Sequence, residues 1–170
     1  MKTILPAVAL AVLSTSAFAN NVDFSQDNKV KFKISGKVAP TCIVSQKARE
    51  DQKTLDLSDS GRQHIQILNV WCNVVNSAAK AKITSKNGGY LVNTQHVDEH
   101  ESHSKVAYKL NVSGAGNFDN QELDQPLDLS LKSDFEDYGS DNTFSVHVAP
   151  NDYILAGTYT DVIKVKVNPN

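Results

Sequence analysis

The stretch that decides the fold is VKFKISGKVAPTCIV, residues 30–44. Every second position, from Val30 to Val44, carries an apolar or small residue, and most positions between them are polar. This alternation is typical of a β-strand that buries one face. We expect one long strand here, with a kink or bulge at Gly36 and Pro40.

The same period-two pattern recurs along the chain, and no sustained helical period follows the first residues. Turns rich in glycine and asparagine separate the runs, for example at residues 87–89 and 138–142. About seven short strands with such punctuation indicate a β-sandwich of immunoglobulin type. The expected strands after the first lie around residues 68–74, 79–83, 106–112, 127–131, 144–148 and 159–167.

The last run is followed by only three residues, although an immunoglobulin sandwich would continue with a further antiparallel strand. Its second face carries Lys164 and Lys166, which is usual for a strand at an edge or facing solvent. We therefore expect a sandwich that lacks its last strand. At the other end, residues 20–28 are polar except for alternating Val22 and Phe24. This segment is either a frayed terminus or a free strand destined for another molecule's sheet.

The first residues have the features of a secretory signal peptide: Lys2, an apolar run over residues 4–13, and small residues that end at Ala19. We assign residues 1–19 to this signal, so the mature chain is exported and is long enough for one domain. Cys42 and Cys72 then enter an oxidising compartment, where we expect them to form a disulfide. The alternative is two separate buried thiols.

Charge and hydropathy exclude some partners. The chain has 17 basic and 19 acidic side chains, a formal net charge of −2. Removal of Lys2 with the signal peptide leaves 16 against 19, a charge of −3. This balance favours neither nucleic acid nor an anionic membrane as a partner. No later stretch is apolar over the length of a membrane-spanning helix, so we expect no membrane insertion.

Several segments, in their order, resemble the pilin subunits of the bacterial chaperone–usher pathway. Residues 30–44 resemble the first pilin strand with its cysteine, and residues 70–72, VWC, resemble the strand with the second. Residues 106–110, VAYKL, and 156–167, AGTYTDVIKVKV, resemble the middle and closing segments. The chain lacks the aromatic residue near the C-terminus of classical pilins, so it is most similar to the archaic branch, with its spore coat protein U-like domains.

The resemblance implies an all-β, incomplete immunoglobulin-like β-sandwich that a donor strand from a partner completes. A periplasmic chaperone, an outer-membrane usher, and other copies or related pilin subunits are the implied partners, and the fibre is carried on the bacterial cell surface. Residues 20–29 become the N-terminal donor-strand extension and residues 30–170 the pilin domain. The implied donor side chains are Val22 and Phe24, and the acceptor groove is expected to include Val30, Phe32, Ile34, Ile163, Val165 and Val167.

The function implied is that of a structural subunit of a fimbria, or pilus, that supports adhesion or biofilm formation. One alternative is a minor or tip adhesin that recognises a host surface ligand. Another is a small periplasmic metal-binding protein, because His96, His100 and His103 alternate with carboxylates that also suit transition metals. A solvated acidic loop explains this histidine cluster equally well. Position 104 is Ser104, so the H-E-x-x-H signature of zinc proteases is absent. With no nucleophile motif either, we expect no catalytic residue, no cofactor and no enzyme activity.

Overall fold

The computed structural model describes residues 29, 31–47, 53–75, 78–96, 102–114, 116, 118–150 and 153–170. The chain divides into two compact units, Met1–Lys37 and Val38–Asn170. The predicted signal peptide and the predicted donor residues Val22 and Phe24 lie outside the described residues. The strands all belong to the second unit.

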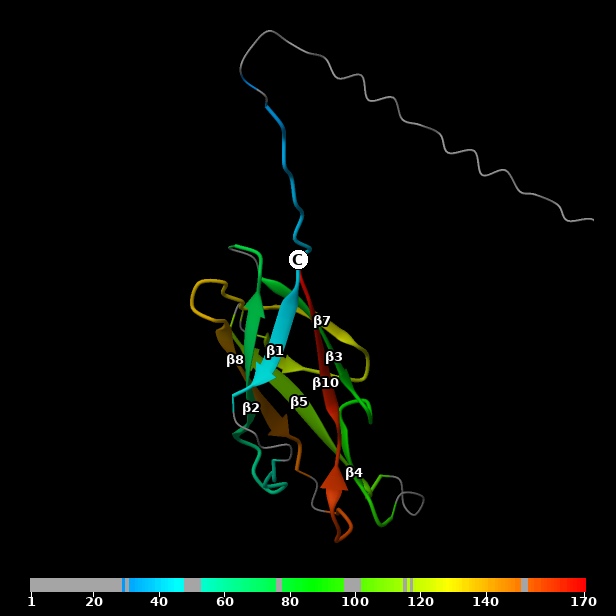
Figure 1. Cartoon of the computed structure of the whole chain (residues 1–170). Helices are drawn as coiled ribbons and strands as arrows, with labels where there is room; N and C mark the ends of the chain where they lie inside the picture. Colours follow the sequence, from blue (N-terminus) through cyan, green and yellow to red (C-terminus); the bar gives the residue numbers. More distant parts are fainter. Residues whose placement is uncertain are drawn as a thin grey trace, which may run out of the picture. The chain divides into compact units, whose positions relative to one another are not determined.

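The second unit is built from antiparallel strands joined by turns (Figure 1). The described residues contain no helix, so none of them forms a helix that could cross a membrane. The strands are β1 (Cys42–Gln46), β2 (Arg62–Cys72), β3 (Ala79–Ser85), β4 (Tyr90–Asn93), β5 (Lys105–Ser113), β6 (Phe118–Gln121), β7 (Leu127–Leu131), β8 (Ser140–Val148), β9 (Tyr159–Thr160) and β10 (Ile163–Asn168).

The strands form two sheets, which confirms the all-β prediction. The larger sheet has the order β1-β2-β8-β5-β4-β9, and β6 pairs with β5 beside this path. The smaller sheet has the order β10-β3-β7. Because β1 and β10 stand at the ends of these orders, each has one backbone edge that no described strand occupies.

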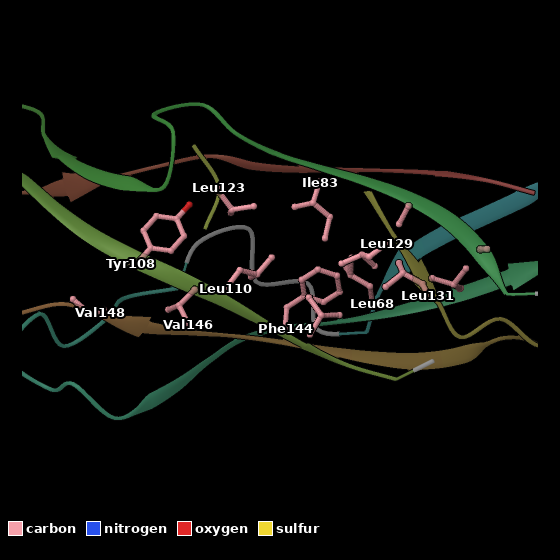
Figure 2. Close-up of a cluster of buried hydrophobic side chains, with 14 of the residues drawn as sticks. Leu68, Ile83, Tyr108, Leu110, Leu123, Leu129, Leu131, Phe144, Val146 and Val148 are labelled. Carbon is pink, nitrogen blue, oxygen red and sulfur yellow. The ribbon is translucent and has the colours of Figure 1, made fainter. Parts of the chain in front are cut away.

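The core lies between the two sheets and is filled by the alternate residues that the sequence pattern marked. In β2, for example, Leu68, Val70 and Cys72 are buried while the residues between them are partly exposed. Figure 2 shows side chains from β2, β3, β5, β7 and β8 packed against one another. Burial of one such aliphatic or aromatic side chain contributes about 1.5–3 kcal/mol, so this layer is the main stabilising element.

The disulfide prediction is confirmed. Cys42 and Cys72 are bonded, with Cα atoms 4.1 Å apart. They face each other directly in the register of β1 and β2, so the bond links β1, at the residue where it begins, to the one described strand that pairs with it.

The prediction of one long strand over residues 30–44 is wrong. Residues 31–41 form no strand, and β1 begins only at Cys42. Phe32, Ile34 and Val38 are exposed, at 80%, 84% and 84% of their surface. Alternation in a sequence reports which residues suit a half-buried strand, but a strand also needs a neighbour to pair with. Ala39 and Thr41 form hydrogen bonds with Asn73, but no described strand pairs with residues 31–38.

The run predicted around residues 159–167 is divided into two strands. β9 pairs with β4 in the larger sheet, whereas β10 pairs with β3 in the smaller one. At the break, the carboxylate of Asp161 accepts hydrogen bonds from the backbone N–H groups of Asn87 and Val162. These side-chain bonds replace strand pairing and let the chain pass from one sheet to the other. The short strands β4 and β6 were not predicted, because each has only four residues.

Candidate functional site

The candidate site is a cleft between the two edge strands, β1 and β10. β1 pairs only with β2, and β10 pairs only with β3 among the described strands. Figure 1 shows β1 and β10 side by side where the two sheets meet. Two strand edges that no other described strand occupies therefore flank the same opening.

The cleft has a volume of about 430 Å³, within the ~300–1,000 Å³ typical of ligand pockets. Its lining includes buried core residues of the larger sheet, which close it toward the interior. Val44 of β1 lines one side, and Ile163 and Val165 of β10 line the other. The remaining apolar lining residues are Leu55, Ile65, Leu68, Leu91, Phe144 and Val146.

A hydrogen-bonded cluster stands at one part of the lining, where Tyr108 and Asp161 meet. Tyr108 donates its hydroxyl hydrogen to Asp161 Oδ2, and the Ser85 hydroxyl donates to the same oxygen over 2.6 Å. Burial and the bond to Asp161 raise the pKa of Tyr108 well above its usual value, so this phenol stays neutral at ordinary pH. The Asp161 carboxylate is fixed by these donors and by two backbone N–H groups.

The lining contains two charged residues, Lys53 and Asp161. The carboxylate of Asp161 already accepts hydrogen bonds from Tyr108 and Ser85. The polar lining also includes Ser45, Gln46 and Gln66. An apolar cleft beside two open strand edges suits an extended peptide, which offers backbone groups to the edges and alternate apolar side chains to the cleft.

Only some of the residues predicted for the acceptor groove line the cleft. Ile163 and Val165 lie in the cleft lining, and Val167 packs against the core as a partly buried residue. Val30 lies outside the described residues. Phe32 and Ile34 belong to the first unit, Met1–Lys37, and are exposed there.

Sequence reasoning missed the parts of the cleft that come from other strands. Leu55 precedes β2 and alternates with Leu57, and this short apolar pair was the only local signal for it. Leu91 follows the turn at Gly88 and Gly89, whose positive φ angles of 65° and 82° favour glycine. A four-residue strand after such a turn is too short for its alternation to stand out.

The predicted histidine cluster is largely outside the described residues, because residues 97–101 are not described. In the part of the chain that is described, no group of three or more His, Cys, Asp or Glu side chains is placed to hold a metal ion.

A solved structure from a fimbrial complex has a fold similar to this one. A chain from a chaperone–tip adhesin complex of CFA/I fimbriae biogenesis matches with a TM-score of 0.50 and 16% identity, over 76% of this chain. The fold is one found in a fimbrial chaperone–adhesin complex. A chain from the CsuC–CsuE chaperone–tip adhesion subunit pre-assembly complex of the archaic Csu pili of Acinetobacter baumannii matches over 76% of this chain, with 18% identity and a TM-score of 0.40.

The present chain spans 41% and 40% of those two chains. No family model matches the sequence, and no curated protein matches it. At these identities the likeness concerns the fold alone.

Proposed function

We propose that this protein is a pilus subunit of the chaperone–usher type, and that the cleft between β1 and β10 accepts a strand from another chain. The observation that carries the proposal is the apolar cleft itself, flanked by two strand edges that no described strand pairs with. Addition of one strand would give both edges a partner and cover Ile163 and Val165. Strand addition to an open edge is an established mode of peptide recognition.

The donor, in this proposal, is the segment before Cys42 of a second copy or a related subunit. Four of the five alternate positions from residue 30 to residue 38 are apolar, and the fifth is Gly36. Among the described ones, Phe32, Ile34 and Val38 are at least 80% exposed and belong to no strand. Exposed apolar side chains with the period of a strand are the complement of an apolar cleft with open edges.

The sequence-based prediction for residues 20–29, with Val22 and Phe24 as the inserted side chains, remains the alternative donor. That stretch has two apolar residues at strand spacing, whereas residues 30–38 have four, Val30, Phe32, Ile34 and Val38. Because the cleft is lined by apolar side chains from several strands, the richer segment fits it better.

Energetics explain why such a subunit needs a partner. If about four apolar side chains fill the cleft, they contribute roughly 6–12 kcal/mol at 1.5–3 kcal/mol each. A whole domain of this size has a net stability of only about 5–15 kcal/mol. The isolated chain is therefore marginally stable, and a periplasmic chaperone that fills the cleft first would protect it.

Assembly follows from the geometry of donor and acceptor. The donor segment and the cleft are different parts of the chain, so the contact is head-to-tail and continues into an open fibre. In this proposal the chaperone strand is exchanged at an outer-membrane usher for the donor of the next subunit, and the fibre reaches the cell surface. Support of adhesion or of biofilm formation is the role that such a fibre would have.

Co-expression tests the proposal. The mature chain, residues 20–170, is produced in the periplasm with and without a fimbrial chaperone from the same bacterium. We expect a soluble 1:1 complex with the chaperone and loss to aggregation or proteolysis without it. A stable, soluble monomer without the chaperone would contradict the proposal.

A tip adhesin is the second candidate, because the two similar chains come from chaperone–tip adhesin or tip adhesion subunit complexes. A terminal subunit needs to accept a strand but need not donate one. A mature chain that lacks residues 20–38 and still occupies every position along the fibre would favour the tip role. We expect instead that this deletion ends fibre growth.

A further inference from the structure

The outer face of the smaller sheet carries a cluster of lysines. Lys164 and Lys166 of β10 and Lys80 and Lys82 of β3 are all exposed and point away from the core, because their neighbours along each strand are buried or half-buried. Lys166 faces Lys82 directly in the strand register. We define these four residues as the lysine face.

This arrangement concentrates positive charge. Neighbouring strands are about 4.8 Å apart, and alternate residues along a strand are about 7 Å apart, so the ammonium groups share one small area. Among the described strand residues on this face, one is acidic: Asp128 of β7, which lies opposite Lys82. Four lysines and one aspartate give a local charge of +3 on a chain whose net charge is −2.

The lysine face differs from the basic residues of the larger sheet. Among the described residues, none of its four lysines forms an ion pair, and Lys82 faces a like charge across the strands, which destabilises a sheet. The larger sheet instead carries paired cations on or beside its strands. These pairs are Lys47 with Asp141, Arg62 with Asp119 at 2.9 Å, and Lys109 with Glu122 at 2.9 Å.

We propose that the lysine face binds an acidic polysaccharide, one whose sulfate or carboxylate groups lie along an extended chain. An anion placed between Lys82 and Lys166 would relieve their repulsion. The other strand positions on the face include Thr84, Ser130 and Asn168, which offer hydrogen bonds to sugar hydroxyls.

The composition of the face favours a polysaccharide over other polyanions. Its described strand positions carry no aromatic side chain on which single-stranded nucleic acid could stack. They also carry no apolar side chain to insert into a lipid surface. A three-stranded face is wider than the helix or two-stranded ribbon that the major groove of duplex DNA admits.

The proposed fibre would enlarge this surface, and this step rests on the proposed function. If Phe32 and Ile34 of a donor enter the cleft beside β10, Lys31 and Lys33 point to the opposite side, because successive residues of a strand alternate. That side is continuous with Lys164 and Lys166. The partner copy would then add cations to the lysine face at every junction.

Two variants with equal charge test the proposal. In the chaperone-bound chain, Lys82→Gln, Lys164→Gln and Lys166→Gln together remove three cations from the lysine face. The control combines Lys47→Gln, Arg62→Gln and Lys109→Gln on the larger sheet. Binding to heparin, to duplex DNA and to vesicles of phosphatidylglycerol with phosphatidylcholine is measured at about 0.15 M salt, where distant charges are screened.

We expect the unaltered complex to bind heparin in preference to DNA and vesicles. The lysine-face variant should lose at least about tenfold in heparin affinity, since each lysine near an anionic surface contributes close to a factor of five. The control should lose less than about twofold. Equal losses in both variants, no heparin binding, or tighter binding of DNA or vesicles would overturn the proposal.

The same experiment separates this proposal from the proposed function. None of the substituted residues lines the cleft, so chaperone capture should be the same for both variants. Fibres, where they form, should bind heparin more tightly per subunit than the chaperone complex does, and Lys31→Gln with Lys33→Gln should remove that increment. If fibres bind heparin no more tightly than the chaperone complex does, only the proposed contribution of Lys31 and Lys33 is wrong. If the lysine-face variant keeps its heparin affinity, the lysine face is not the binding site.

Discussion

The hydroxyl of Tyr108 donates a hydrogen bond to the carboxylate of Asp161, across 53 residues of sequence. Tyr108 belongs to β5 of the larger sheet, and Asp161 stands between β9 and β10, where the chain passes to the smaller sheet. Both residues line the cleft. This bond therefore helps to fix the point where the chain leaves the larger sheet and enters β10, which is one flank of the proposed acceptor site.

Replacement of Tyr108 by Phe should destabilise the fold by about 1.5–3 kcal/mol, the usual value of a hydrogen bond to a charged group. The apolar ring is retained, so the core should stay packed. Guanidinium unfolding of the chaperone-released, donor-bound chain would measure the loss. An unchanged unfolding midpoint would show that the bond does not hold the strand in place.

Alkaline pH should act through the same residue. The pKa of Tyr108 is raised in the folded chain by burial and by its bond to Asp161, whereas an unfolded tyrosine has a pKa of about 10. Above pH ~10 the folded chain holds a proton that the unfolded chain has lost, so the free energy of unfolding should fall as pH rises further. Tyr108→Phe should lose this part of the pH dependence. A variant with the same alkaline slope as the unaltered chain would assign the effect to other groups.

The disulfide should be needed for the edge of the cleft. A bond that closes a loop with a sequence separation of 30 stabilises by about 3–4 kcal/mol in the chain-entropy model. Since Cys42 begins β1, its loss also frees one flank of the cleft. We expect Cys42→Ser with Cys72→Ser to leave the isolated chain unfolded and to abolish chaperone capture. Circular dichroism and co-purification measure the two effects, and normal capture would contradict the role assigned to β1.

Charge in the cleft should prevent capture. Ile163→Asp or Val165→Asp places a carboxylate in an apolar lining, where an unpaired charge is costly. Val162→Asp is the matched control, because Val162 is 49% exposed and does not belong to the lining. The yield of soluble chaperone complex should collapse for the first two variants and stay near normal for the control. Equal yields would exclude the cleft as the chaperone's site.

Substitutions in the extension should identify the donor. Phe32→Asp and Ile34→Asp place charges on the face that would enter the cleft, and Ser35→Asp places one on the opposite face. We expect the first two to stop polymerisation without affecting chaperone capture, and Ser35→Asp to allow both. Phe24→Asp tests the alternative segment. If it stops polymerisation and Phe32→Asp does not, residues 20–29 are the donor.

Local patterns were enough to predict most of the sandwich. The alternation around Leu68 and Val70 predicts buried positions, because successive residues of a strand point to opposite faces of the sheet. The same alternation places Ile163 and Val165 on one face of their strand, and both line the cleft. Their role in an acceptor groove is what the pilin resemblance implies, and it stays a prediction. Export predicted the disulfide independently of geometry.

The rest depends on contacts between distant residues. The break at Asp161 is made by bonds to Ser85 and Asn87, more than 70 residues away, and the sequence run across it looks continuous. The absence of a strand over residues 31–41 has another cause. Alternation gives this segment the character of a strand, but no described strand pairs with residues 31–38. A pattern within one chain cannot distinguish a strand that pairs internally from one that pairs with another molecule.

Peptide complementation of the mature chain tests the open cleft most directly. The chain is purified as its chaperone complex, denatured, and refolded at low concentration with a synthetic peptide of residues 29–41. A peptide with Phe32→Asp and Ile34→Asp serves as control. At about 100 times its Kd, a ligand of the folded state should raise the unfolding temperature by roughly 5–10 °C. We expect this rise with the native peptide and none with the control. A high unfolding temperature that neither peptide changes would contradict the claim that a strand from another molecule completes the fold.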